Sequence, residues 1–275
     1  MAFCLICCLQ PNNKAMKPSK SIVFITGAFF SNSCWNEWEL YFEANGYQCT
    51  APAWPHKKAS SEDLRNRHPN AEIASNRLTT ITDHYASIVH ALPGKPVLVG
   101  HSLGGLIVQL LIHRGLGTAG VAIHSFPPHG VNRFNFSFLK SSLEAMDFFS
   151  ATAKSYMISF KKWKRSIANG IDCEEQKQSY YDYAIPESKL VIRDSFKCRA
   201  KINFNDPHAP LLFTSGSNDK FMPARVNYNN YKKYKHPGSI TSYKEFKGHN
   251  HLVFGDTAWM DEAEFILNWL QKINQ

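Results

Sequence analysis

The chain has 275 residues and a formal net charge of +9, with 44% hydrophobic and 13% aromatic residues. This length suits one domain with an insertion, and the apolar content is enough for a large core, which excludes a disordered or fibrous chain. No apolar stretch reaches the length of a membrane-spanning helix. Despite its positive charge, the sequence contains no combined aromatic and basic motif of the kind typical of nucleic-acid-binding domains.

The N-terminal tail, residues 1–20, opens with a short apolar stretch that contains Cys4, Cys7 and Cys8. This stretch is too short for a secretory signal and no basic segment precedes it, so we expect no cleaved leader. Seven cysteines without metal-site spacing favour free thiols and a cytoplasmic location. We expect a disordered tail; the alternative is that Cys7 and Cys8 accept an acyl chain and bring the protein to a membrane surface.

Short apolar runs alternate with helical patterns along most of the chain. We expect strands at residues 21–26, 47–51, 95–99, 120–123, 211–214 and 241–246, and helices at 35–44, 79–92, 105–112 and 259–270. Residues 56–75 are polar and are expected to form a loop. The alternation predicts an α/β fold: a mostly parallel sheet of about six strands, covered by helices on both faces.

The pattern changes between residues 130 and 208, where no run is suited to a central strand and helices are expected at 156–167 and 174–183. The phenylalanines of this region are concentrated at its start, at Phe134, Phe136, Phe138, Phe148 and Phe149. We therefore expect a core of residues 21–129 and 209–275, with residues 130–208 as a helical cap over the carboxyl ends of the strands. The alternative is that these aromatic side chains form only the cap's own core.

Basic residues are concentrated at 161–165 and 231–235. We interpret both clusters as solvated helix faces. The alternative is attraction to an anionic membrane or to an acidic substrate.

The pattern G-x-S-x-G occurs once, at Gly100–Gly104, between an expected strand and an expected helix. Strand, tight turn and helix are the setting in which this pattern forms a nucleophile elbow. Side chains at the two glycines would collide with the neighbouring strand and helix, and the turn strains Ser102. The serine hydroxyl is thereby exposed near a helix N-terminus, which stabilises negative charge. We expect Ser102 to be a catalytic nucleophile, with His101 turned away into the packing.

An acid and a base follow Ser102 in the chain order Ser, Asp, His that this type of fold uses. Asp219 lies in a turn after the expected strand at 211–214, and His251 follows the last expected strand. A serine hydroxyl needs a base to remove its proton, and the base needs an acid to orient it. His249 competes with His251 for the role of base. The pair could also belong to a metal site, but no further ligands accompany it at suitable spacing, so we expect no metal or cofactor.

The oxyanion of an acyl-transfer reaction needs two backbone N–H donors. The residue after the nucleophile, Leu103, supplies one. The turn after the first strand supplies the other, which we assign to Ala28 because Gly27 lets the backbone come close.

Over about residues 20–272 the chain resembles the α/β-hydrolase superfamily, and within it lidded serine hydrolases of the esterase and lipase type. The resemblance rests on residues 25–29, 99–105, 126–130, 184–188, 209–219 and 246–251. In such relatives a single histidine matches His251, which favours it over His249. Thr26 departs from the pattern, because many relatives carry histidine there.

The resemblance implies a serine hydrolase that cleaves carboxylic esters through an acyl-enzyme, with an apolar acyl or alcohol group. The expected partner is a small-molecule ester and not a nucleic acid. The same fold also supports thioesterase, amidase, lyase and C–C hydrolase chemistry. A ligand-binding protein with residual turnover is a further alternative.

Overall fold

A computed structural model describes residues 20–131, 152–255 and 258–273 of the chain. The tail at residues 1–19 and the phenylalanine cluster at 134–149 lie outside the described residues. In the described part, no helix is both long and apolar enough to cross a membrane.

Six parallel strands form one sheet in the order β2-β1-β3-β4-β5-β6. The strands are β1 (Ser21–Ile25), β2 (Gln48–Thr50), β3 (Val97–His101), β4 (Ala119–Ile123), β5 (Leu211–Gly216) and β6 (Thr241–Phe246). The four central strands are buried along their whole length, whereas β2 and β6 at the edges are partly exposed. Strands covered on both faces are expected to be continuously apolar, and β1 and β3 follow that rule. The predicted α/β fold and its six strands are confirmed.

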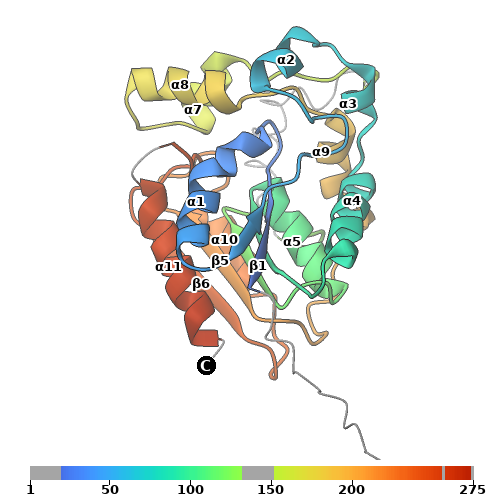
Figure 1. Ribbon diagram of the computed structural model, residues 1–275, viewed down its shortest axis with the longest axis vertical. Helices are drawn as coiled ribbons and strands as arrows, with labels where there is room; N and C mark the ends of the chain where they lie inside the picture. Colours follow the sequence, from blue (N-terminus) through green and yellow to red (C-terminus); the bar gives the residue numbers. More distant parts are fainter. Residues whose placement is uncertain (1–19, 132–151, 256–257, 274–275) are drawn as a thin grey trace, which may run out of the picture.

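Helices cover the sheet on both faces (Figure 1). Helices α1 (Asn36–Ala44) and α11 (Ala258–Ile273) contact each other on one face, and α4 (Leu78–Ala91) and α5 (Leu103–His113) contact each other on the other. Helix α10 (Ala224–Tyr231) packs against β5 and β6. The buried face of α11 includes Ala263, Ile266, Leu267 and Leu270, as its helical spacing predicts.

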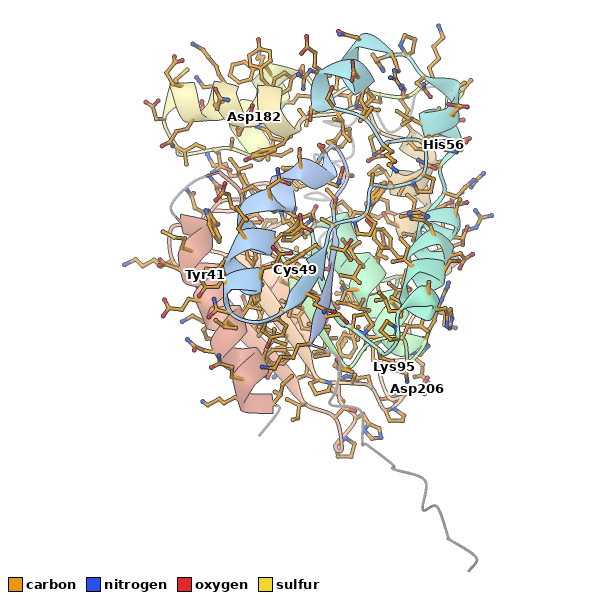
Figure 2. The ribbon with its side chains drawn as sticks, in the orientation of Figure 1. Tyr41, Cys49, His56, Lys95, Asp182 and Asp206 are labelled. Atoms are coloured by element: carbon orange, nitrogen blue, oxygen red, sulfur yellow. The ribbon has the colours of Figure 1, made fainter. Side chains whose placement is uncertain are left out.

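A second layer of helices lies beyond the carboxyl ends of the strands (Figure 1). It contains α2 (Ser61–Asn66), α3 (Ala71–Ser75), α7 (Phe160–Ser166), α8 (Cys173–Tyr183) and α9 (Lys189–Ser195). Figure 2 shows Asp182 of α8 in this layer and Lys95, just before β3, at the opposite end of the molecule. The strands therefore run toward this layer. Ser61 in α2 donates a hydrogen bond to the carbonyl oxygen of Asp182, which joins the two parts of the layer.

Three local predictions are wrong. Residues 56–75 are not only loop, because Ser60 and Asn70 cap α2 and α3 by accepting hydrogen bonds from Asp63 and Ile73 N–H. The helix expected from residue 156 begins at Phe160, since Tyr156 pairs with Glu187 in an isolated bridge and Ser159 caps the helix. The basic residues at 232–235 lie beyond the end of α10, not on a helix face.

Candidate active site

Ser102 occupies the turn between β3 and α5 in a strained conformation, with φ 57° and ψ −117°. Its N–H donates to the carbonyl oxygen of Ile123 at 2.8 Å, and its own carbonyl oxygen accepts from Gly105 and Phe126. A non-glycine residue with positive φ costs about 1–3 kcal/mol, so surrounding contacts must impose it. These three hydrogen bonds fix the turn from both sides.

The glycines of the motif permit this turn because their neighbours leave no room for a side chain. A Cβ on Gly100 would collide with the backbone of Gly104, and a Cβ on Gly104 would collide with the backbone of Ile25. Gly27 is also tightly packed, because a Cβ there would lie 2.9 Å from the Cβ of Ser102. The backbone after β1 therefore lies directly against Ser102.

His251 lies between Ser102 and Asp219. Its Nε2 is 3.0 Å from Ser102 Oγ, and its Nδ1 is 2.7 Å from Asp219 Oδ2. All three side chains are buried. His249 does not reach Ser102 or Asp219 by any hydrogen bond or ion pair of the described residues; its ring instead stacks on Phe246, 5.0 Å between centroids.

Asp219 accepts hydrogen bonds at both of its carboxylate oxygens. Oδ1 accepts from the backbone N–H groups of Phe221 and Met222, at 2.8 and 2.6 Å. Oδ2 accepts from His251 and from a second histidine, His124, at 3.0 Å. Burial alone would raise the pKa of Asp219, but the two histidines outweigh it and lower the pKa to about 2. The carboxylate is therefore ionised at every pH at which a histidine titrates.

Sequence analysis missed two buried residues that continue this chain of contacts. His124 follows β4 directly, and its Nε2 lies 3.6 Å from Oε2 of Glu262 in α11. The position of His124 at the carboxyl end of a strand was a usable signal, because parallel sheets gather functional groups there. Glu262 gave no such signal, since it lies among charged residues in an ordinary amphipathic helix.

His101 packs behind His251. Its Nε2 contacts the carbonyl oxygen of His251 at 2.9 Å, and the two rings lie 4.7 Å apart. Burial, with smaller contributions from His251 and His124, lowers the pKa of His101 well below its usual value. His101 is therefore neutral and packs against the site, as the position beside the serine predicts.

The expected oxyanion donors, Ala28 and Leu103, belong to the two backbone segments that meet at Ser102. Leu103 is the first residue of α5, so its N–H has no acceptor within that helix. In the turn after β1, Phe29 has φ 70° and donates its N–H to Glu187 Oε2 at 3.1 Å. The N–H of Ala28 donates to no backbone group of the described residues. The turn therefore leaves the Ala28 N–H available, while the neighbouring one is occupied.

Glu187 is itself held by a buried lysine. Lys57 Nζ lies 2.5 Å from Glu187 Oε2 and 4.3 Å from the centroid of the Trp54 ring. The second carboxylate oxygen of Glu187 accepts the N–H of Ser188 at 2.7 Å. The turn after β1 is thus anchored to residues of the 130–208 segment by an ion pair whose carboxylate oxygens both accept hydrogen bonds.

Ligand atoms of His124, Asp219 and His251 lie within 4.8 Å of one another, a spacing that a metal ion could use. Both imidazole Nδ1 atoms, however, are at hydrogen-bond distance from the same ionised oxygen. A carboxylate only accepts, so both Nδ1 atoms carry protons and donate. This leaves Nε2 of His251 free to accept from Ser102, and we assign no metal to these residues.

The arrangement can activate an alcohol. A serine hydroxyl aligned with an imidazole, whose other nitrogen donates to an ionised carboxylate, forms a nucleophile, base and orienting acid. Ser102 at the N-terminus of α5 also places the reacting centre where a developing negative charge is stabilised.

The family model described as "Alpha/beta hydrolase family" matches residues 22–263. None of the curated proteins compared with the sequence matches it.

Many solved structures share the fold. A methylesterase from Arabidopsis superimposes with a TM-score of 0.64 at 13% identity, covering 91% of this chain and 98% of its own. A monoacylglycerol lipase from Paleococcus ferrophilus gives 0.64 at 20% identity, with 92% and 95% covered. An extracellular alpha/beta-hydrolase from a Paenibacillus species gives 0.65 at 18% identity, with 89% and 97% covered. At these identities the similarity establishes the fold.

Proposed function

The chain belongs to the alpha/beta hydrolase family, and on that premise we propose that it cleaves carboxylic esters by a serine nucleophile through an acyl-enzyme. The observation that carries the proposal is the pair of hydrogen bonds that joins Ser102, His251 and Asp219. Esterases and a lipase among the structures that share the fold favour an ester over other acyl groups.

The geometry supports the following reaction. Ser102 Oγ attacks the ester carbonyl carbon while its proton passes to Nε2 of His251. The N–H groups of Ala28 and Leu103 donate hydrogen bonds to the carbonyl oxygen as it becomes an oxyanion. The intermediate then expels the alcohol, which takes the proton from His251 and leaves Ser102 acylated.

Deacylation repeats these steps with water. His251 removes a proton from a water molecule, which attacks the acyl carbon, and the proton then returns to Ser102 Oγ as the acid leaves. Asp219 stays ionised throughout and stabilises the imidazolium of His251 in both half-reactions. The proposed steps use only the chain's own side chains and backbone N–H groups, the ester and water.

We propose that residues 130–208 form a cap that shapes the substrate pocket. Their described helices lie in the layer beyond the carboxyl ends of the strands, which is the end at which Ser102 sits (Figure 1). The aromatic residues of this segment favour an apolar acyl or alcohol group, since each buried methylene contributes about 0.8 kcal/mol.

Labelling with a fluorophosphonate tests the nucleophile. The wild-type protein is expected to be labelled at Ser102 and to hydrolyse short-chain p-nitrophenyl esters. Ser102→Ala is expected to lose labelling and to lower ester turnover by about 10⁴-fold or more. Ser87→Ala, an exposed serine of α4, is the matched control and should behave as wild type. Labelling of another residue, or activity that survives Ser102→Ala, would disprove the proposal.

A panel of esters that differ only in acyl length tests the substrate class. Apolar walls predict that kcat/KM rises from acetate toward medium-chain esters and then falls when the pocket is full. A profile that is highest for acetate would contradict an apolar pocket while leaving the serine mechanism intact.

A further inference from the structure

Two buried ionisable side chains lie behind the candidate triad and take no part in the reaction proposed above. His124 and Glu262 are both completely buried, and their nearest ring nitrogen and carboxylate oxygen are 3.6 Å apart. That distance is too long for a hydrogen bond, and among the described residues neither oxygen of Glu262 has a hydrogen-bond partner. A buried carboxylate without such partners is costly unless a charge compensates it.

His124 is held in a defined place. Its backbone has φ 45°, a strained conformation for a residue with a side chain, and its N–H donates to the carbonyl oxygen of Thr214 at 3.0 Å. Gly216 makes room for the ring, because a Cβ there would lie 2.9 Å from Cε1 of His124. Strain of this kind persists where the surrounding structure imposes it, and it is concentrated at functional sites.

Ionisable groups face His124 from four elements. Asp219, after β5, contacts its Nδ1, and Glu262 of α11 lies opposite its Nε2. The ring centroids of His101 in β3 and of His251 after β6 lie 6.3 and 6.1 Å, respectively, from the ring centroid of His124. His249, also after β6, has its Nδ1 3.9 Å from Oε2 of Glu262, so Glu262 faces both histidines.

These surroundings favour a positive charge on His124. Burial lowers its pKa, but the negative charge of Glu262, with the hydrogen bond and charge of Asp219, outweighs burial and raises the pKa overall. His101 is neutral and does not oppose this charge. His124 thus lies between two carboxylates that both favour its cationic form, and one of them belongs to the candidate triad.

We propose that His124 and Glu262 are positioning residues of the same reaction, which act through Asp219 and set the pH range in which His251 accepts the proton of Ser102. This proposal rests on the proposed function. Cationic His124 offsets part of the negative charge with which Asp219 stabilises the imidazolium of His251. Asp219 therefore presents less net negative charge to His251 than it would alone, and Glu262 is the group that favours the charge on His124.

The consequence for a Glu262→Gln variant has a definite sign. Without the carboxylate, burial favours neutral His124, which still donates its Nδ1 proton to Asp219. Asp219 then acts on His251 with its full charge. The acidic limb of the kcat/KM profile is expected to move to higher pH by about half a unit or more. Asp219 cannot cause that limb, because its own pKa is about 2.

The experiment measures kcat/KM against pH for wild type, Glu262→Gln and Glu264→Gln, with a short-chain p-nitrophenyl ester. Glu264 is exposed on the same helix and is the matched control, so its profile should coincide with that of wild type. His124→Asn should move the limb in the same direction as Glu262→Gln. If the two residues act as one unit, the double variant should move it no further than either single variant. An unmoved acidic limb in folded Glu262→Gln would overturn the proposal.

A second measurement needs neither activity nor a variant that folds. Nuclear magnetic resonance of wild-type protein with ¹⁵N-labelled histidine should show both ring nitrogens of His124 protonated at pH 7.5, while His101 is neutral. A neutral His124 at that pH would overturn the proposal even if the enzyme were active. Failure of the ester mechanism itself would appear separately, as fluorophosphonate labelling that persists in Ser102→Ala.

Discussion

Two completely or nearly completely buried carboxylates, Glu187 and Glu262, lie in very different surroundings. Glu187, 1% exposed, has a lysine and two backbone N–H donors on its oxygens. Glu262, 0% exposed, has no hydrogen bond among the described residues and faces only His124 and His249, at 3.6 and 3.9 Å. Lys57 therefore compensates the charge of Glu187 through a direct hydrogen bond, whereas the histidines lie too far from Glu262 for a hydrogen bond.

The difference separates two uses of a buried charge. An ion pair whose carboxylate also accepts backbone hydrogen bonds is rigid, and removing one partner leaves the other uncompensated. Glu187 should therefore act mainly on stability and on the shape of the turn that carries Ala28. A charge pair without hydrogen bonds adds little rigidity, but its field reaches the neighbouring groups, so Glu262 should act mainly on protonation.

The largest expected effect is a loss of ester turnover when His251, the candidate base near Glu262 and His124, is replaced. His251→Ala should lower ester turnover by about 10⁴-fold or more while leaving the free energy of unfolding near that of wild type. His249→Ala should lower turnover far less, because its ring reaches neither Ser102 nor Asp219. The reverse ranking in steady-state kinetics would move the base to His249.

A large loss of stability is expected on the Glu187 side. Glu187→Ala leaves the charge of Lys57 buried and removes two hydrogen-bond acceptors, so the free energy of unfolding should fall by about 3–5 kcal/mol. Urea unfolding measures the loss. Adding Lys57→Met to Glu187→Ala removes the uncompensated charge and should recover part of it. Equal stability of wild type and Glu187→Ala would show that the pair is no anchor.

A smaller effect with a distinctive pH dependence is expected for the stability of Glu262→Gln. Glu262 raises the pKa of His124 in the folded protein, so its stabilisation is complete below the unfolded value of about 6.5 and declines as pH rises through the folded pKa. The stability difference between wild type and Glu262→Gln should therefore shrink between pH 6 and pH 9. A difference that grows with pH would contradict a charged His124. Glu264→Gln should show no such trend.

The smallest effect is expected outside both regions. Deleting residues 1–17 removes none of the candidate site residues, and the first strand begins at Ser21. Ester turnover and unfolding should stay within error of wild type. We also propose that acylation of Cys7 or Cys8 would bring the protein to membranes. Fractionation of full-length and truncated protein from cells tests this, since only the full-length form should sediment with membranes.

The sequence predicted the central sheet well because its buried strands are short and mostly apolar, and each is followed by a turn. Prediction was poor where capping polar side chains, not apolar periodicity, start a helix. Residues 56–75 looked like a loop, yet Ser60 and Asn70 cap two short helices there. Ser60 followed by Asp63 is a pattern typical of a helix N-terminus, but it lies in a polar segment that was interpreted as a loop.

In the candidate site, too, local motifs could be predicted from the sequence, whereas contacts between distant residues could not. Ser102 belongs to a local motif with a fixed backbone requirement, so sequence alone could locate it. His124 and Glu262 are 138 positions apart, and the contact exists only because α11 packs beside the end of β4. Glu262 lies between residues typical of a solvated helix face, Asp261 and Glu264, so nothing local distinguishes it. Glu187 was seen only as part of a family motif, and Lys57 lay in the residues expected to be loop.

The hydrogen bond from Phe29 to Glu187 spans 158 positions of the chain and joins the turn beside Ser102 to the segment 130–208. This contact limits how the protein can be rebuilt. Replacing the segment with that of a relative, to alter substrate preference, would also remove the contact between Glu187 and the turn after β1. A graft should therefore retain Glu187 together with Lys57, and chimaeras that keep only one of them should fold poorly even when the new pocket fits its substrate.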